Sequence, residues 1–453
     1  MVALLTLLSA AVDEIKVPIE TPAQYDRRAK WFRDAKVGVF IHWNPSSLIP
    51  GEISWCRDSY GREKYDNLYR SFKAKKFNAD EWVSLFRTAG IRYSVLVPKH
   101  HDGFCMWDTK TSPYNVMNTP FGRDYLKEMS AACKKGGVKF CLYYSILDWW
   151  NPKYKGNAGF DLTPYKNDVF KPHMKELLTH YGTVGCVWFD GNWEGSWTHA
   201  NGREMYAYGR DIAPQTLFGN RIEPKPTTPE PELLNTGEAG VAVNGDLPYV
   251  SSFYNAPDAV GDYQAREMML GHYYDKKAWD SCYNFSPPTE YPNGGWSHMP
   301  NVHPRPLHQI VSWIIGCIGR DGNALLGIGP RADGTIDPET VGRLKELGAW
   351  TKANGKAIYG TRGGPYLPGS WGVSTRVGRK VYLFLTDPKV AQVALPALGA
   401  TVKSARLISG GKVEVSQADG LSFSVPEAAR TPMCTIVELT LDRDAKGLVV
   451  VKT

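Results

Sequence analysis

The 453-residue sequence predicts an α/β fold: a (β/α)8-like barrel of the TIM type, followed by a C-terminal antiparallel β-sandwich. From about residue 25 to residue 360, short β-branched or aromatic runs alternate with amphipathic stretches, as in repeated β-α units around a parallel sheet. The runs are apolar throughout, which is typical of strands buried on both faces. After Tyr359-Gly360 the chain alternates polar and apolar residues between Gly and Pro turns, which predicts antiparallel strands.

The barrel elements follow in chain order. Strands are expected at residues 37–42, 93–98, 138–144, 185–190, 216–221 and 324–329. Helices are expected at residues 78–89, 124–135, 306–318 and 338–354, each opened by Asn, Asp or Pro. Most of these strands end in polar residues, and a barrel of this type places its active site on the loops at the carboxyl ends of its strands.

The remaining segments complete the predicted organisation. Residues 222–262 are rich in Pro and carry few helix signals, which indicates a long insertion on the active-site face or a disordered loop. The sandwich strands include 380–385, 405–408 and 434–441. We therefore expect an N-terminal lead-in (1–24), a catalytic barrel (25–360) and a β-sandwich (361–453).

Composition narrows the function classes. The 53 basic and 46 acidic side chains give a net charge of +7 without a basic run, so a nucleic-acid partner is not expected. The 15 Trp and 24 Tyr favour a carbohydrate ligand, because aromatic rings with a polar edge stack on the apolar faces of sugars. The eight cysteines form no C-x-x-C pair, so free buried thiols are expected rather than a zinc site or a disulfide framework.

The N-terminus suggests an exported protein. Its first eleven residues resemble the apolar and small-residue parts of a signal peptide, although the basic n-region is missing. We expect a secreted or periplasmic location. No apolar run approaches the roughly 20 residues of a membrane-spanning helix, so no membrane association is expected.

The predicted strand ends carry the candidate chemistry. Asp190 follows an apolar strand and stands between Trp188 and Gly191. Retaining glycoside hydrolysis needs such a carboxylate with a second carboxyl group about 5–5.5 Å away. That group must come from another loop, where Glu238, Glu267, Asp280 and Glu290 are candidates.

The residues after the second predicted strand could alternatively form a metal site. His100, His101 and Asp102 are ligand types that zinc binds. Adjacent strand residues point to opposite faces, so both imidazoles would reach one ion only if the backbone bends. We therefore expect no metal and no cofactor.

Several blocks of sequence resemble the α-L-fucosidases of glycoside hydrolase family 29. The blocks are WFRDAKVGVFIHW (31–43), FNADEW (77–82), KHHDGF (99–104), YYS (143–145), WFDG (188–191), GNALLGIGP (322–330) and NGKAIYG (354–360). They occur in the right order and span residues 25–360.

The resemblance implies a retaining exo-glycosidase that removes terminal α-L-fucosyl residues from fucosylated glycans through a covalent fucosyl-enzyme. Asp190 matches the family nucleophile. The residues that match the fucose pocket are His42, Trp55, His100, His101, Tyr144, Trp188 and Arg221.

The sequence identifies the acid/base residue less clearly than the nucleophile. Glu267 lies in a segment, GDYQARE, that resembles the one carrying this residue in some members, although its neighbour Arg266 would lower the pKa of an adjacent carboxyl group. The alternatives are Asp280, in a Trp-Asp-Ser-Cys context where other members have Glu, and Glu238.

One position departs from the family pattern. Many members have Glu directly before the pocket Trp, whereas this chain has Ser54 before Trp55, with Glu52 as the nearest carboxylate that could replace it. Two alternative functions stay open. An α-L-galactosidase would use the same mechanism, because an apolar pocket rejects one added hydroxyl only weakly. A fucose-binding pseudo-enzyme would have kept the pocket and lost the acid/base.

Overall fold

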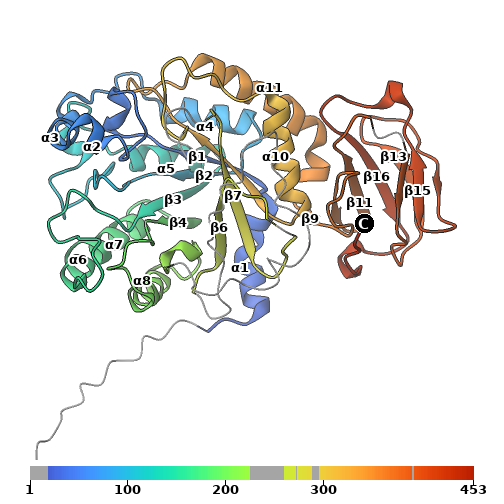
Figure 1. Ribbon diagram of the computed structural model, residues 1–453, viewed down its shortest axis with the longest axis horizontal. Helices are drawn as coiled ribbons and strands as arrows, with labels where there is room; N and C mark the ends of the chain where they lie inside the picture. The colour runs from blue at the N-terminus through green and yellow to red at the C-terminus, as the bar shows by residue number, and fades with distance from the viewer. Residues whose placement is uncertain (1–18, 225–259, 272, 288–294, 390–391) are drawn as a thin grey trace, which may run out of the picture.

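The computed structural model describes residues 19–224, 260–271, 273–287, 295–389 and 392–453 (Figure 1). Within them, eight parallel strands form one sheet in the order β5-β4-β3-β2-β1-β8-β7-β6. Their bounds are β1 Val37–Ile41, β2 Tyr93–Leu96, β3 Lys139–Ser145, β4 Cys186–Asp190, β5 Leu217–Phe218, β6 Tyr263–Glu267, β7 Ala278–Asn284 and β8 Asn323–Ile328. A parallel bridge between Gly219 and Tyr263 brings the two end strands together, so the sheet is a nearly closed barrel.

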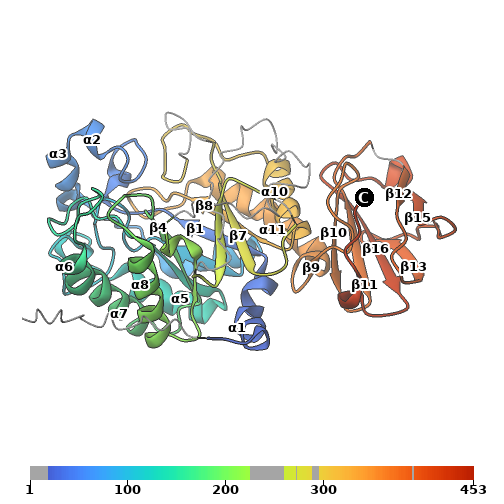
Figure 2. The ribbon, with the colours of Figure 1, turned by 60° about the horizontal axis from the view of Figure 1, so that its bottom comes forward.

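Helices surround this sheet, as Figures 1 and 2 show. The described helices are α1 Pro22–Ala35, α2 Arg57–Tyr60, α3 Arg62–Asp66, α4 Ala79–Thr88, α5 Tyr125–Gly136, α6 Thr163–Tyr165, α7 Lys171–Thr179, α8 His199–Ile212, α10 Leu307–Gly319 and α11 Pro338–Ile358. Local sequence sets their ends: the side chains of Asn78 and Asp124 cap α4 and α5, and Gly137 adopts the left-handed conformation that ends α5.

Two apolar layers hold the barrel together. The outer layer lies between the strands and the helices, and the inner layer fills the barrel itself. In the inner layer Phe32 of α1 packs against Tyr93 and Tyr263, with ring centroids 5.4 and 4.9 Å away. Gly38 is required there, because a Cβ atom at this position would lie 2.3 Å from the Tyr93 ring. Helix α1 therefore contributes to the floor of the barrel, opposite the carboxyl ends of the strands.

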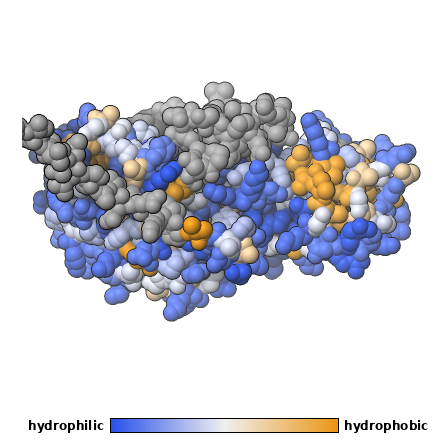
Figure 3. Space-filling model, turned by 90° about the horizontal axis from the view of Figure 1, so that it is seen from below, coloured by the Kyte–Doolittle hydropathy of each residue, from blue (hydrophilic) through white to orange (hydrophobic). Residues whose placement is uncertain are grey.

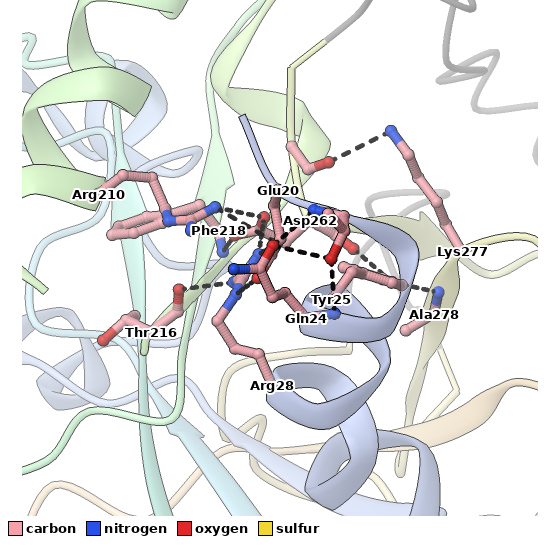
Figure 4. A network of polar contacts seen from close by, with 12 residues as sticks. Glu20, Gln24, Tyr25, Arg28, Arg210, Thr216, Phe218, Asp262, Lys277 and Ala278 are labelled. Carbon is pink, nitrogen blue, oxygen red and sulfur yellow. Dashed lines mark hydrogen bonds and ion pairs between the residues drawn. The ribbon is translucent and has the colours of Figure 1, made fainter. Parts of the chain in front are cut away.

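A buried network of hydrogen bonds and ion pairs connects β5, β6 and β7 (Figure 4). One carboxylate oxygen of Asp262 accepts a hydrogen bond from Arg28 at 2.7 Å, and the other accepts the Phe218 backbone N–H at 2.8 Å. The Tyr25 hydroxyl donates to the Asp262 carbonyl and accepts the Ala278 N–H, both at 2.8 Å. Two residues of α1 thus connect the three strands at which the barrel closes.

The C-terminal region is a sandwich of two antiparallel sheets with strand orders β13-β16-β11-β10-β9 and β12-β15-β14. The bounds are β9 Arg362–Gly363, β10 Val373–Val377, β11 Lys380–Leu385, β12 Gln392–Leu395, β13 Val402–Leu407, β14 Val415–Ser416, β15 Leu421–Ser424 and β16 Thr435–Leu441. Trp371 packs against Tyr366 and is 9% exposed. Figure 3 shows apolar side chains gathered on one face of this region, beside a mostly hydrophilic surface.

The structure confirms the predicted fold class, and strands β1 to β5 and β8 occur where the apolar runs predict them. All eight cysteines are buried free thiols. None of the helices among the described residues is long and apolar enough to span a membrane. Most of the predicted 222–262 insertion and of the N-terminal signal-like segment lies outside the described residues.

Candidate active site

Asp190 is the last residue of β4, and its carboxylate lies at the carboxyl end of the barrel. One oxygen accepts a hydrogen bond from the Tyr143 hydroxyl at 2.9 Å, and the other accepts one from Arg221 at 2.9 Å. The side chain is 13% exposed. Gly191 follows with φ 84°, and a Cβ atom there would lie 2.5 Å from Leu147. The sharp turn after Asp190 therefore depends on glycine.

Glu267 is the last residue of β6 and faces the same end of the barrel. Arg221, on the short turn after β5, donates one N–H to Asp190 and another to Glu267, each at 2.9 Å. Its guanidinium lies 4.5 Å from the centroid of the Trp188 ring. One buried cation thus brings the predicted nucleophile and the first-choice acid/base together. Arg221, which matches a pocket residue of the family, contacts both carboxyl groups.

The environment of Asp190 changes its acidity. Burial raises the pKa of Asp190 to about 6, and the negative charge of Glu267 contributes to the rise. Arg221 and the Tyr143 hydroxyl act in the opposite direction, because both stabilise the carboxylate. The group can therefore still be ionised near neutral pH while remaining shielded from water.

Three histidines line the space beside Asp190. The Nδ1 atoms of His100 and His101 bond the hydroxyls of Ser54 and Ser145, each at 2.7 Å. Burial lowers the pKa of His42 to about 3 and lowers those of the other two well below the usual range. Neutral imidazoles each offer one donor and one acceptor, which suits sugar hydroxyls.

Aromatic rings form a wall next to these histidines. Tyr143 stacks on Trp188 with centroids 5.7 Å apart, and His100 stacks on Tyr143 at 5.4 Å. Trp296 lies 5.4 Å from His42, next to the same wall. Such a wall fits an apolar sugar face.

The sequence assigned the wrong tyrosine to the pocket. Tyr144 points out of the barrel, where its hydroxyl bonds His173 of α7 at 2.9 Å and its ring packs on Phe170. Tyr143 points inward to Asp190. Successive side chains of a strand alternate between its faces, so only one of the two can reach the site.

The other acid/base candidates stand elsewhere. Asp280 is the third residue of β7, wholly buried inside the barrel, with the Tyr93 hydroxyl 3.4 Å away. Burial raises the pKa of Asp280 to about 8, which favours its neutral form. Glu238 and Glu290 lie outside the described residues.

Arg266 does not contact Glu267, although it is the adjacent residue in the sequence. Arg266 points away from Glu267: it donates to Gln264 and to the Leu270 carbonyl and lies 3.9 Å over the Trp279 ring. The cation next to Glu267 is therefore Arg221 rather than Arg266.

Glu52 does not replace the missing family glutamate. Its carboxylate accepts the backbone N–H groups of Gly295, Trp296 and Ser297 at 2.8–3.1 Å and the Ser297 hydroxyl at 2.7 Å. It thereby holds the loop that carries Trp296. Ser54, at φ 63°, stands where many family members have glutamate, and its hydroxyl bonds His100.

The argument against a metal site assumed a regular strand at His100 and His101, and the backbone departs from that geometry. The chain bends at the end of β2, so the His100 and His101 rings lie 4.0 Å apart on the same side. With Asp190 they form a group whose potential ligand atoms lie within 4.8 Å of one another. Asp102 is directed elsewhere, to Tyr65 at 2.7 Å and Asn44 at 2.9 Å. Each member of the group already has a partner in the site, so the arrangement equally suits a hydroxylated ligand.

Tryptophans surround the entrance. Trp55 is 47% exposed and lies 5.4 Å from His101, with Trp149 at 5.4 Å and Trp193 at 6.4 Å from its own ring. Tyr143, Trp149, Trp193 and Trp296 were not singled out from the sequence. Their spacing carries no signal, because each comes from a different loop or strand.

Comparison with known proteins agrees with this geometry. The family model for Alpha-L-fucosidase matches residues 9–356. Human plasma alpha-L-fucosidase is 27% identical over 405 residues, which cover 82% of this chain and 80% of the relative. Bovine tissue alpha-L-fucosidase is also 27% identical, over 73% of this chain and 69% of its own.

Solved structures give the same result. Alpha-L-fucosidase isoenzyme 1 from Paenibacillus thiaminolyticus superimposes with a TM-score of 0.75 at 28% identity, covering 92% of this chain and 99% of its own. An alpha-L-fucosidase from Bacteroides thetaiotaomicron, solved as a trapped covalent intermediate with 2-fluoro-fucosyl fluoride, has a TM-score of 0.76 at 23% identity, covering 92% and 96%. The matching family model and this barrel show that the chain belongs to the alpha-L-fucosidase family of glycoside hydrolases.

Proposed function

We propose that this α-L-fucosidase removes terminal α-L-fucosyl residues from glycans with retention of configuration, using Asp190 as nucleophile and Glu267 as acid/base. The observation that carries the proposal is the contact of both carboxylates with the single guanidinium of Arg221. A retaining pair has to stand close together. The comparisons favour neither an α-L-galactosidase nor a binding protein.

The reaction divides into two steps. Asp190 attacks the anomeric carbon while Glu267 donates its proton to the departing glycosidic oxygen, giving a fucosyl ester. Glu267 then takes a proton from water, and the water attacks the same carbon and releases fucose. The covalent intermediate trapped in the Bacteroides relative is the kind of species that the first step produces.

Arg221 keeps the charge of the site balanced in both steps. Before attack, Asp190 is the anion that faces Arg221, and Glu267 carries the proton. After attack, Asp190 is a neutral ester and Glu267 is the anion. The guanidinium therefore has one carboxylate partner throughout, and charge moves between two groups that it already contacts.

The fucose site is formed by the inner wall of the barrel. His42, His100 and His101 supply donors and acceptors for the hydroxyls, and the Trp188 and Tyr143 rings face the apolar side of the sugar. The substrate would be a fucosylated oligosaccharide or glycoconjugate. The plasma relative supports a secreted location.

The test of Glu267 is chemical rescue. With an aryl α-L-fucoside, whose leaving group needs little protonation, Glu267→Ala should accumulate the ester and turn over slowly, and azide should restore turnover. Asp190→Gly should be inactive without azide. Any azide product it forms should have inverted configuration, because azide would attack the substrate directly, whereas the azide product of Glu267→Ala should have retained configuration.

Asp280→Asn is the matched comparison. It should retain activity and show no azide effect, because the buried Asp280 does not face the substrate. Rescue of Asp280→Asn instead of Glu267→Ala would reverse the assignment. Normal turnover by Asp190→Gly would refute the mechanism.

A further inference from the structure

A cavity of about 410 Å³ opens at the amino end of the barrel. It lies where α1, α5 and α11 end and where β2 and β3 begin, so it is at the opposite end of the barrel from Asp190. Its volume lies within the range of small-ligand sites in proteins. The proposed hydrolysis makes no use of this end of the barrel.

Part of the lining is apolar. The side chains of Ala35, Cys133 and Val138 contribute to it and are buried. The rings of Trp31 and Tyr359 belong to the same lining and are half-buried, so part of each ring is open to solvent. Aromatic rings of this kind pack against the apolar face of a sugar.

Two cations are held against these rings. The Lys139 Nζ lies 5.3 Å from the centroid of the Trp31 ring, and the Arg92 guanidinium carbon lies 4.5 Å from that of Tyr359. The Lys139 backbone N–H donates to the Arg92 carbonyl at 2.9 Å, so the starts of two neighbouring strands hold the two residues side by side. A cation–π contact fixes a cation in place and leaves its charge unneutralised.

The cavity carries surplus positive charge. Arg92, Lys134 and Lys139 line it, and none of them has an ion-pair partner among the residues that the structure describes. The carboxylate of the lining, Asp34, is already paired twice, once with Arg362 at 2.9 Å. An anion bound here would therefore meet cations whose charge no described carboxylate offsets.

We propose that this cavity binds an acidic sugar residue of a glycan, with the sugar ring against Trp31 and its sulfate or carboxylate group between Arg92 and Lys139. A glycan is favoured over other anions because the rings and apolar side chains suit a sugar and because this enzyme acts on glycosides. The site would retain the enzyme on an acidic polysaccharide without taking part in the hydrolysis.

The experiment measures the binding of oligosaccharides to the full chain by isothermal titration calorimetry at low ionic strength. Dextran sulfate and galacturonic acid oligosaccharides are the two acidic probes, which separate sulfate from carboxylate. Dextran oligosaccharides of equal length carry the sugar without charge, and sodium sulfate carries charge without the sugar. We expect at least one acidic oligosaccharide to bind more tightly than either of these two.

The variant removes the two ring-held cations. Arg92→Gln/Lys139→Gln should weaken binding of the preferred acidic oligosaccharide about 10-fold or more. The matched control, Lys175→Gln/Lys403→Gln, removes two exposed lysines of α7 and β13 and gives the same net charge, so it should bind as the wild type does. Circular dichroism checks the fold of each variant, and kcat/KM for an aryl α-L-fucoside should be unchanged in both.

Three outcomes would overturn the inference. Equal weakening in the control would show that only net charge attracts the probe, and sodium sulfate binding as tightly as the oligosaccharides would show an anion site that ignores the sugar. No binding of either acidic oligosaccharide to the wild type would show that the cavity is not used. Because each result is a binding measurement, the inference fails or stands independently of the proposed hydrolysis.

A single-stranded DNA oligonucleotide with the same charge as the dextran sulfate probe tests the other kind of polyanion. It should bind more weakly than the preferred acidic oligosaccharide. Tighter binding of the oligonucleotide, lost in Arg92→Gln/Lys139→Gln and kept in the control, would assign the cavity to nucleic acid and would contradict the proposal.

Discussion

At the scale of single residues, the site depends on which side of a strand a side chain takes. Asp190, Tyr143 and Arg221 meet because β3, β4 and the turn after β5 each end with one inward side chain. Arg221 is buried, yet both its terminal nitrogens have carboxylate partners. A buried cation that contacts two carboxyl groups fixes the positions of both, and removing Arg221 would leave the ionised one buried without a counter-charge.

The acidity of Asp190 predicts the acid limb of the pH profile. The nucleophile works as a carboxylate, and its pKa is raised to about 6, so kcat/KM should fall as pH drops through about 6. In Arg221→Met the stabilising cation is gone, and the limb should move to higher pH by about 1–3 units, whereas Arg221→Lys should move it less. Profiles of kcat/KM for α-L-fucosyl fluoride between pH 4 and 9 decide this, and an unmoved limb in Arg221→Met would contradict the prediction.

The adjacent tyrosines form a matched pair. Tyr143→Phe removes a hydrogen bond to the Asp190 carboxylate, so kcat/KM should fall about 10-fold. Tyr144→Phe loses the hydroxyl contacts with His173 and Tyr165, outside the site, and should keep its kcat/KM while the free energy of unfolding falls by about 1 kcal/mol. Steady-state kinetics and urea titration of both variants test the pair. The reverse pattern would mean that Tyr144 faces the substrate.

At the scale of elements, the Glu52 side chain anchors residues 295–297. Glu52 accepts three successive backbone N–H groups, which fixes Trp296 beside His42. Glu52→Gln puts an amide donor against backbone donors. We expect KM for the fluoride substrate to rise about 10-fold, with a smaller change in kcat. The exposed Glu63→Gln on α3 is the control, and an unchanged KM in Glu52→Gln would show that the loop needs no such anchor.

The elements also show what a sequence reveals. Strands β1 to β5 and β8 could be predicted because they are nearly continuous apolar runs between turn residues. Strands β6 and β7 were not recognised, because Gln264, Arg266, Asp280 and Ser281 interrupt them. Arg266 bonds Gln264 and the Leu270 carbonyl, Ser281 bonds the Met269 carbonyl, and Asp280 lies beside the Tyr93 hydroxyl. These polar residues are buried only in the assembled barrel, and no local sequence pattern encodes that.

The site divides in the same way. Asp190, Glu267 and the histidines stand at strand ends, where the barrel rule directs attention. Two features could not be foreseen: the Arg221 bridge, which joins three segments of the chain, and the inward choice of Tyr143 over Tyr144. The Arg221 bridge depends on closure of the barrel. The choice between Tyr143 and Tyr144 depends on which of two adjacent strand residues faces inward, and two neighbouring tyrosines give no sequence signal for that.

At the scale of the whole molecule, the barrel closes through polar contacts as much as through its sheet. Asp262→Ala would leave Arg28 short of a partner and the Phe218 N–H unpaired at the β5–β6 seam. The free energy of unfolding should fall by about 3–5 kcal/mol. Urea titration followed by tryptophan fluorescence measures this, with the exposed Asp211→Ala of α8 as the control; equal stability of the two variants would show that the seam does not depend on the network.

The eight buried thiols have a consequence for the chain as a whole. They are spread from Cys56 to Cys434, across both the barrel and the sandwich, and none forms a disulfide bond. A thiol-specific reagent should therefore react slowly with the folded protein, because its cysteines are buried. Once a region unfolds, the cysteines of that region become accessible and react. The order in which the cysteines react would map, segment by segment, which region of the molecule gives way first, and dithiothreitol should leave the thermal midpoint unchanged.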